Sequence, residues 1–155
     1  MVKLFGRACL SLLGATVLLG LGSPVVAKTG YLCEFDNLRA RGFILSPFVF
    51  VLAEDGASAT VMDPLILGEK EKPIAAKVRK KSNGALQISW SVNGIGTMSR
   101  GADISVSYTS TFDAGKNTIR TRGKLAGLPQ IENAKGACRV LDEKWIAGNK
   151  WLKKS

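Results

Sequence analysis

The stretch Ile74–Phe112 reads IAAKVRKKSNGALQISWSVNGIGTMSRGADISVSYTSTF, and its alternation of apolar and polar residues decides the fold class. In three consecutive runs, Ile74–Lys81, Leu86–Val92 and Ala102–Phe112, apolar side chains recur mainly at every second position. Successive side chains on a strand point to opposite faces of the sheet. This period predicts three strands with one dry face and one wet face, arranged as an antiparallel meander.

The turn at 82–84 sets the register of the first two strands. A two-residue loop, Asn83-Gly84, would place the apolar Val78 opposite the polar Ser89. A three-residue loop with Gly84 in the left-handed region places Val78 opposite Ile88, and we expect this loop. The same register pairs Ala76 with Trp90 and Ile74 with Val92.

Five further strands are expected outside this stretch. They are Tyr31–Phe35, Phe48–Glu54 with Phe43–Leu45 as its lead-in, Ser58–Met62, Lys116–Leu125 and Gly136–Leu141. The segments 93–101 and 127–135 contain glycine or proline without a clear period, so we expect links there. A series of eight short strands must hide its edges, either in an up-and-down barrel or in a two-sheet sandwich.

The strand predicted at Phe48–Glu54 is apolar on both faces, so its outer face needs a cover. One candidate cover is the apolar excursion Asp63–Gly68, and the other is a short helical or irregular tail, Asp142–Ser155. The tail mixes aromatic and basic residues, which also suits an anionic membrane surface. Because it is short and contains Gly148-Asn149, we expect it to dock on the body of the protein. In the tail, Trp145, Ile146, Trp151 and Leu152 are interleaved with Lys144, Lys150, Lys153 and Lys154.

The chain begins with the pattern of a secretory signal peptide, Met1–Ala27, with cleavage expected after Ala27. Its apolar run is shorter than the roughly 20 residues that a spanning helix needs, so we expect no transmembrane helix in the mature chain. The expected organisation is a signal peptide at 1–27, a barrel or sandwich domain at 28–141 and a basic aromatic tail at 142–155. We expect export to the periplasm.

Cys33 and Cys138 are the cysteines that remain after the signal peptide. An even pair in an exported chain predicts a disulfide. A disulfide needs Cα atoms within about 7 Å of each other, so the first and last predicted strands are expected to be neighbours. This favours a closed barrel, although a sandwich with those strands adjacent satisfies the same condition.

The charge balance is basic. The whole chain has a formal net charge of +10, and the signal peptide carries two of its 22 Lys and Arg and none of its 12 Asp and Glu. The mature chain therefore has a net charge of +8. Such a balance favours anionic partners, such as an envelope polymer or a lipid surface, but it also suits a plain solvated surface.

The composition disfavours an enzyme. The chain contains no histidine, which removes Ser-His-Asp and Cys-His arrangements and most catalytic zinc sites. Phosphate-binding and dinucleotide motifs are also missing, and we expect no cofactor and no metal. The acidic pairs Glu34/Asp36 and Glu54/Asp55 lie at predicted strand ends or turns, where carboxylates are usually solvated.

Two predicted strands carry basic side chains on their outer face, and two neutral, hydroxyl-rich strands lie between them. This candidate surface fits a sugar phosphate or another anionic polymer. The alternative explanation of the same pattern is the ordinary polarity of exposed strands, which prevents aggregation. Nucleic acid is disfavoured because no exposed aromatic side chain offers base stacking. The candidate anion-binding residues are Lys77, Arg79, Lys81, Arg120, Arg122 and Lys124.

The predicted interior combines large and small side chains. Trp90, Tyr108 and Phe112 are the large aromatic candidates for contact with an interior ligand, because barrels of about eight strands can enclose one. The alternative function is therefore a carrier of a small apolar ligand. A solid core is favoured over a cavity, since protein interiors are close-packed.

Several short motifs resemble those of small exported β-rich proteins of Gram-negative bacteria that have no assigned catalytic activity. The motifs are Tyr-x-Cys-Glu-Phe (31–35), Arg-Gly-Phe-Ile (41–44), Asp-Pro-Leu-Ile (63–66), Lys-Val-Arg (77–79), Leu-x-Ile-x-Trp (86–90) and Gly-x-Cys (136–138). The resemblance covers most of 28–141 and implies a periplasmic β-domain with one disulfide. It carries over no catalytic residue, and the segment after Leu141 extends beyond it. The sequence as a whole predicts a non-enzymatic periplasmic binding or interaction module.

Overall fold

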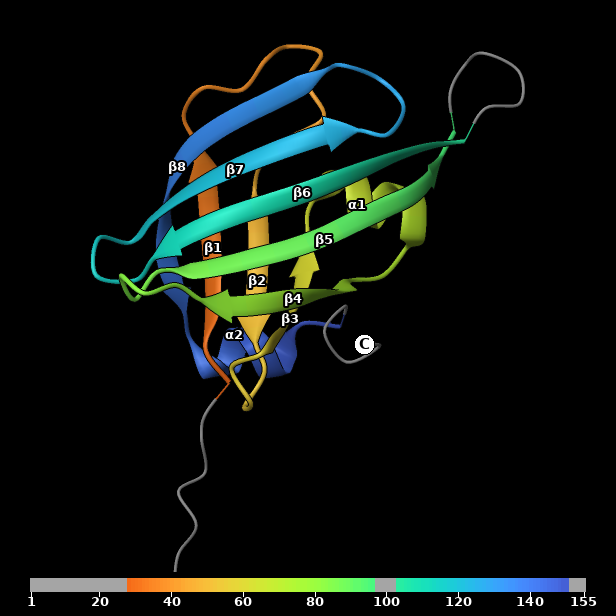
Figure 1. Ribbon diagram of the computed structural model, residues 1–155. Coiled ribbons are helices and arrows are strands. Elements are labelled where there is room, and N and C mark those ends of the chain that lie inside the picture. Colours follow the sequence, from red (N-terminus) through yellow and green to blue (C-terminus); the bar gives the residue numbers. More distant parts are fainter. Residues whose placement is uncertain (1–27, 97–102, 151–155) are drawn as a thin grey trace, which may run out of the picture.

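The computed structural model describes residues 28–96 and 103–150. Eight antiparallel strands close into a barrel in their sequence order, and two short helices complete the fold (Figure 1). The elements are β1 (Gly30–Phe35), β2 (Phe48–Leu52), β3 (Ser58–Met62), α1 (Pro64–Lys70), β4 (Ile74–Lys80), β5 (Leu86–Ile95), β6 (Ile104–Asp113), β7 (Thr118–Leu125), β8 (Ile131–Leu141) and α2 (Glu143–Gly148).

The first and last strands meet, which closes the barrel. β1 pairs with β8 in antiparallel register, with Cys33 directly opposite Cys138. These two cysteines form a disulfide that joins positions 105 residues apart in the chain. Both the predicted disulfide and the predicted strand adjacency are confirmed, and the all-β fold is a barrel.

The hairpin that sets the central register has the expected three-residue loop. Val78 lies opposite Ile88, and Gly84 has a φ of +83°, in the left-handed region. The backbone N–H of Lys81 donates to the carbonyl of Ala85 at 2.8 Å, which closes the loop. The predicted register is therefore correct.

The predicted end of β2 and the predicted start of β8 are wrong. β2 ends at Leu52 instead of Glu54, because a tight turn begins at Ala53, whose carbonyl accepts the N–H of Gly56. β8 begins at Ile131 instead of Gly136. The alternation of polar and apolar residues does not mark the start of β8, because its first inward-facing side chain is a buried glutamate, Glu132.

The links around β6 and β7 also differ from the prediction. β5 continues to Ile95 through an irregularity between Val92 and Ile95, where Gly94 adopts a positive φ of +69°. Such a bulge keeps strand pairing in a stretch whose glycines suggest a loop. β7 begins at Thr118 instead of Lys116, after a turn that contains Asn117 at a φ of +51°. Ala102, predicted to face inward, lies outside the described residues.

Aromatic side chains fill the middle of the barrel. Trp90 stacks between Phe48 and Tyr108, with ring centroids 4.8 and 5.0 Å away and interplanar angles of 11° and 13°. Phe112 packs edge-on against Phe50 at 5.1 Å. Offset and stacked pairs of this kind add to the stabilisation from burying the rings.

Chain connections cover one end of this core. The β1–β2 loop and α1 lie at the same end of the barrel (Figure 1). Each inserts one isoleucine into the main core, since Ile44 and Ile66 are 2% and 0% exposed. Asp63 begins α1 as its N-cap, and its carboxylate accepts the N–H of Ile66 at 2.8 Å.

The expected outer cover of β2 is confirmed, and both candidate segments contribute to it. Val49 of β2, Met62 and Leu141 form a second apolar cluster outside the barrel wall. Side chains from both helices pack on this cluster: Leu67 from α1, and Trp145 and Ile146 from α2. The part of the tail after residue 150 lies outside the described residues.

Truncating Ile146 to alanine is expected to lower the free energy of unfolding by about 1 to 2 kcal/mol, because the side chain is half-buried in this cluster. Urea unfolding checks the value, with the exposed Lys144→Ala as the control in the same helix. An unchanged midpoint, together with lost binding to anionic vesicles, would show that the tail is a membrane anchor instead.

Candidate functional site

The predicted basic strands lie on the outer surface of one side of the barrel. Lys77 and Arg79 on β4 and Arg120 and Arg122 on β7 are exposed, and β5 and β6 lie between these two strands. Lys81 follows β4 in the turn, and Lys124 lies further along β7. We call these six residues together with Lys135 of β8 the cationic face.

Strand register places the cationic side chains in rows that cross the sheet. Arg79 is opposite Gln87, Gln87 opposite Thr111, and Thr111 opposite Arg120. Arg120 in turn lies opposite Lys135. The neighbouring row runs Lys77, Ser89, Thr109, Arg122 and Asn133. Each row therefore has cations towards its two sides and hydroxyl or amide groups in its middle.

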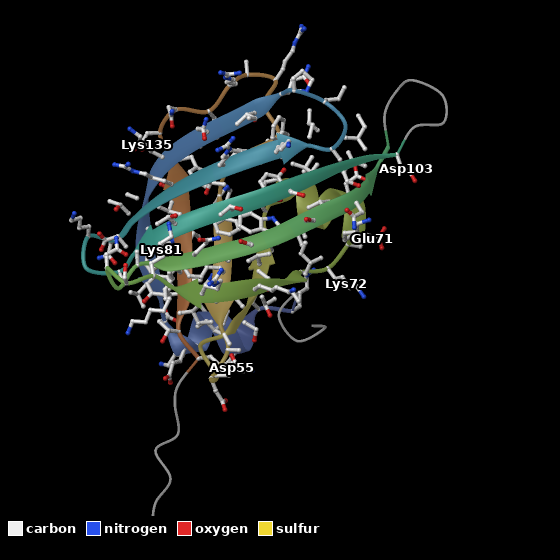
Figure 2. The ribbon with its side chains drawn as sticks, in the orientation of Figure 1. Asp55, Glu71, Lys72, Lys81, Asp103 and Lys135 are labelled. Carbon is white, nitrogen blue, oxygen red and sulfur yellow. A yellow bond between two sulfur atoms is a disulfide. The ribbon has the colours of Figure 1, made fainter. Side chains whose placement is uncertain are left out.

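Nothing acidic neutralises the cationic face within the residues 28–96 and 103–150. None of its cations forms an ion pair there, and Asp113, at the end of β6, pairs with Lys116 at 3.7 Å. Figure 2 shows Lys81 and Lys135 towards one end of the visible sheet surface, with Asp103, Glu71 and Lys72 towards the opposite end. Acidic side chains therefore lie at the end of this surface opposite to Lys81 and Lys135.

One lysine already reaches into the middle of this surface. Lys81 Nζ donates to Thr111 Oγ1 at 3.1 Å, so its side chain crosses β5 to reach β6. The hydroxyls of Ser91 and Ser107 form a further cross-strand hydrogen bond at 3.1 Å. We call the hydroxyl-bearing residues Ser89, Ser91, Ser107, Thr109 and Thr111 the hydroxyl field.

One surface depression lies beside the hydroxyl field and a second includes part of it. The first, of about 480 Å³, is lined by Arg79, Lys80, Lys81, Ser82, Asn83 and Gln87. The second, of about 410 Å³, is lined by Thr109, Thr111, Arg120, Thr121, Arg122, Asn133, Ala134 and Lys135. Four of the predicted anion-binding residues line them, whereas Lys77 and Lys124 lie outside both.

Sequence reasoning missed the contribution of β8 to this surface. Asn133 and Lys135 line the second depression, but 127–135 was predicted to be a link. The signal that identifies the strand is the inward alternation of Glu132, Ala134 and Gly136, which continues into Cys138. Small side chains and one buried acid replace the apolar residues that usually mark a strand.

The candidate interior residues lie inside the barrel and pack against other side chains. Trp90, Tyr108 and Phe112 are 6%, 2% and 0% exposed. Trp90 and Tyr108 stack on each other, whereas Phe112 contacts Tyr31 and Phe50. An apolar ligand among these rings would require them to separate. The carrier alternative stays a prediction, which native mass spectrometry tests by detecting a co-purifying molecule.

A buried polar cluster, missed in the sequence, fixes the β1–β2 loop to the barrel. Glu132 is 2% exposed, and its Oε2 accepts the backbone N–H groups of Phe43 at 2.7 Å and Ile44 at 3.2 Å. The Tyr108 hydroxyl donates to the carbonyl of Phe43 at 2.6 Å. Burial raises the pKa of Tyr108, and the negative charges of Asp63 and Glu132 raise that pKa further.

Two glycines make room for this loop. A Cβ atom at Gly42 would lie 2.1 Å from Glu132 Oε1, and one at Gly123 would lie 2.6 Å from Cε2 of Phe43. Both distances are shorter than real Cβ contacts, so each glycine permits a close approach that a side chain would prevent. The loop therefore packs directly on β7 and β8.

Asp63 is expected to make stability depend on pH. Burial raises its pKa above the ordinary 3.8, against the hydrogen bonds from Ile66 and Leu65 that lower it. The folded state then binds this proton more tightly than the unfolded chain does, so Asp63 costs stability at neutral pH. This cost disappears as the pH falls through the raised pKa towards 3.8.

Urea unfolding of the wild type and of Asp63→Asn at pH 7 and near pH 4 tests this expectation. Asparagine keeps the helix cap but does not ionise. We expect the stability of the wild type relative to the variant to rise as the pH falls. A difference that does not change with pH would contradict the assignment.

The described residues contain no group of three or more His, Cys, Asp or Glu placed to hold a metal ion. In the same part of the chain, no helix is long and apolar enough to cross a membrane. Comparisons of the chain with protein-family models, with curated proteins and with solved structures find no match.

Proposed function

We propose that this barrel is a non-enzymatic binding module whose cationic face holds an anionic polymer of the cell envelope. The observation that carries the proposal is the arrangement of cations on either side of the hydroxyl field, where several of them line two depressions. Within residues 28–96 and 103–150, none of these cations forms an ion pair. Hydroxyl and amide groups suit the neutral parts of a glycan, and the cations suit its charges. Ordinary strand polarity does not require cations to gather in this way.

A glycan is favoured over nucleic acid because the cationic face offers no aromatic platform. Trp90, Tyr108 and Phe112, the aromatic residues of β5 and β6, all point into the barrel and are buried. Binding of single-stranded nucleic acid commonly relies on bases stacked on exposed aromatic rings. The cationic face offers ionic interactions and hydrogen bonds, and a charged polysaccharide can form both.

The proposed location is the periplasm. A structural disulfide persists in an oxidising compartment, and Cys33–Cys138 is such a bond. The expected signal peptide and the net charge of +8 for the mature chain support the same proposal, because envelope polymers are commonly anionic. Mass spectrometry of the protein from an envelope fraction tests it, with a mature chain beginning at Lys28 as the expected result.

Binding to heparin, a polysulfated polysaccharide, tests the proposed function. We expect Arg120→Ala/Arg122→Ala to raise the dissociation constant about tenfold at low salt, a loss of about 1.4 kcal/mol. The charge-matched control is Lys72→Ala/Lys144→Ala, which removes two exposed cations that lie outside the strands of the cationic face. Equal losses in both variants would show that net charge alone drives binding and would refute the proposed surface.

A further inference from the structure

The last part of the β1–β2 loop is held at the end of the barrel by contacts of the kind that bind a peptide. Phe43 and Ile44 donate their backbone N–H groups to Glu132 Oε2, and the carbonyl of Phe43 accepts the Tyr108 hydroxyl. From this arrangement and from the second, unpaired oxygen of Glu132 we infer a binding site for the free amino terminus of a peptide that begins with an aromatic residue. The loop occupies this site when no such peptide is bound. The inference concerns one end of the barrel and does not depend on the proposed function of the cationic face.

Three neighbouring strands build the seat of Phe43. Tyr108 of β6 lies opposite Gly123 of β7, which lies opposite Glu132 of β8, and all three residues are buried. Because Gly123 has no side chain, the ring of Phe43 packs directly on the backbone of β7. The rings of Phe43 and Tyr108 meet edge to face, with centroids 6.4 Å apart. This row of three residues, which we call the loop seat, offers room for an aromatic ring, a hydroxyl donor and a carboxylate.

The loop pairs with only one oxygen of the Glu132 carboxylate. The side chain is 2% exposed, and its Oε1 has no hydrogen-bond partner among residues 28–96 and 103–150. In the same part of the chain, Glu132 forms no ion pair. Burying a charge without a cation, or a polar atom without a hydrogen bond, costs free energy. An occupant that brings a positive charge and a donor for Oε1 would therefore bind this carboxylate better than the loop does.

An ammonium group at the position of the Phe43 nitrogen supplies both. It has one positive charge and three N–H donors, whereas a backbone amide nitrogen has one donor and no charge. In the loop, Gly42 lies against the unpaired oxygen, since a Cβ atom at Gly42 would be 2.1 Å from Glu132 Oε1. A peptide that begins at this position has no preceding residue, so its ammonium group can direct donors to both oxygens. Capture of an amino terminus is one of the ways in which proteins recognise peptides.

The loop can be displaced from its seat without opening the sheet. Residues 36–41 are exposed, whereas Ile44 is 2% exposed and Phe43 is half-buried. Near the start of the loop, the side-chain oxygen of Asn37 accepts the backbone N–H of Lys135 at 2.9 Å. Phe43 and Ile44 lie outside β1 and β2, so moving them breaks no strand pair. The loop that spans this end of the barrel in Figure 1 is therefore an exchangeable occupant.

Isothermal titration calorimetry with phenylalanyl-isoleucine amide and its N-acetylated form tests the inference. Phe43→Ala weakens the hold of the loop on its seat, so we expect this variant to bind the free-amine peptide at least tenfold more tightly than the wild type does. Acetylation removes the positive charge and should weaken binding to the variant at least tenfold. Adding Glu132→Gln to Phe43→Ala should cause a similar loss, whereas adding Asn133→Ala, the exposed neighbour, should change the affinity less than twofold. Circular dichroism confirms that each variant is folded.

NMR of the wild-type protein gives a second measurement that needs no variant. An excess of the free-amine peptide should shift the amide signals of Phe43, Ile44 and Gly123 but not that of Lys77, and the acetylated peptide should shift none of them. These shifts decide the inference if Phe43→Ala does not fold.

Three results would overturn the inference. Equal binding of the free and acetylated peptides to Phe43→Ala would show that the variant contains only an apolar cavity. Unchanged binding after Glu132→Gln would exclude the carboxylate from the site. A folded Phe43→Ala that binds the free-amine peptide no better than the wild type would show that the loop does not compete for it.

Discussion

Replacing Cys33 and Cys138 together by alanine is expected to lower the free energy of unfolding by about 4 kcal/mol. The disulfide joins residues 105 positions apart. In the chain-entropy model a bridge across about 100 residues contributes about 4.7 kcal/mol by restricting the unfolded chain. Measured gains are often smaller than the model value, so the expected loss is set at about 4 kcal/mol, below that value. Denaturant unfolding of the oxidised wild type and of the double variant measures the loss.

Reduced wild-type protein is the matched control, because it keeps both cysteine side chains and loses only the bond. Its stability should fall close to that of the double variant. Thiol titration of unfolded, unreduced protein from an envelope fraction should detect neither cysteine. Two titratable thiols would contradict the bond and would remove the reason for the large effect.

Glu132→Ala is expected to destabilise the protein by about 2 to 5 kcal/mol. The change leaves the part-buried N–H of Phe43 and the buried N–H of Ile44 without their acceptor, and a buried unpaired donor costs about 1 to 3 kcal/mol. It also opens a cavity beside β7, because Glu132 is 2% exposed. Glu132→Gln keeps one side-chain oxygen in place and should lose less stability than Glu132→Ala.

Amide hydrogen exchange distinguishes this specific role from a general loss of stability. In Glu132→Ala, the amides of Phe43 and Ile44 should exchange faster by a larger factor than the core amide of Val61, which lies on β3. Asn133→Ala, an exposed neighbour on the same strand, should change stability by less than about 0.5 kcal/mol. Uniform acceleration at all three amides would show that the carboxylate does not hold the loop.

The hairpins between Ile74 and Leu125 could be predicted because each has a polar outer face and an apolar inner face. In that region the alternation marks the strands, and Gly84 sets a register that the structure confirms. Barrel and sandwich could not be separated by this pattern, since both bury one face of every strand. The placement of the cysteines on the first and last strands favoured the barrel.

The start of β8 could not be predicted because its inner face is not apolar there. Glu132 points into the barrel, where a carboxylate is normally excluded, and only its contacts with the loop explain its burial. Those contacts join residues about 90 positions apart, which local alternation does not reveal. The polar cluster around Tyr108 could not be predicted for the same reason, because its hydrogen bond to the carbonyl of Phe43 joins distant parts of the chain.

The cationic side chains of the candidate site were predictable one strand at a time, but the site itself was not. Alternation assigns Arg120 and Arg122 to an outer face, and the burial pattern agrees. That Lys135 lies beside Arg120, and that Lys81 reaches Thr111, depends on the register of neighbouring strands. Depressions arise from several strands together, so no single stretch predicts them.

Closure through β1 and β8 also protects the protein from association through its strands. Every described strand of the barrel has a hydrogen-bonded neighbour on both sides, and such a sheet has no open edge on which another chain could add a strand. Beyond the end of β1, the following loop covers the edge of β8. The backbone N–H of Asp36 donates to the carbonyl of Lys135, and the side-chain oxygen of Asn37 accepts the backbone N–H of Lys135. The disulfide thus holds together the first and last strands, whose separation would expose two strand edges to other chains.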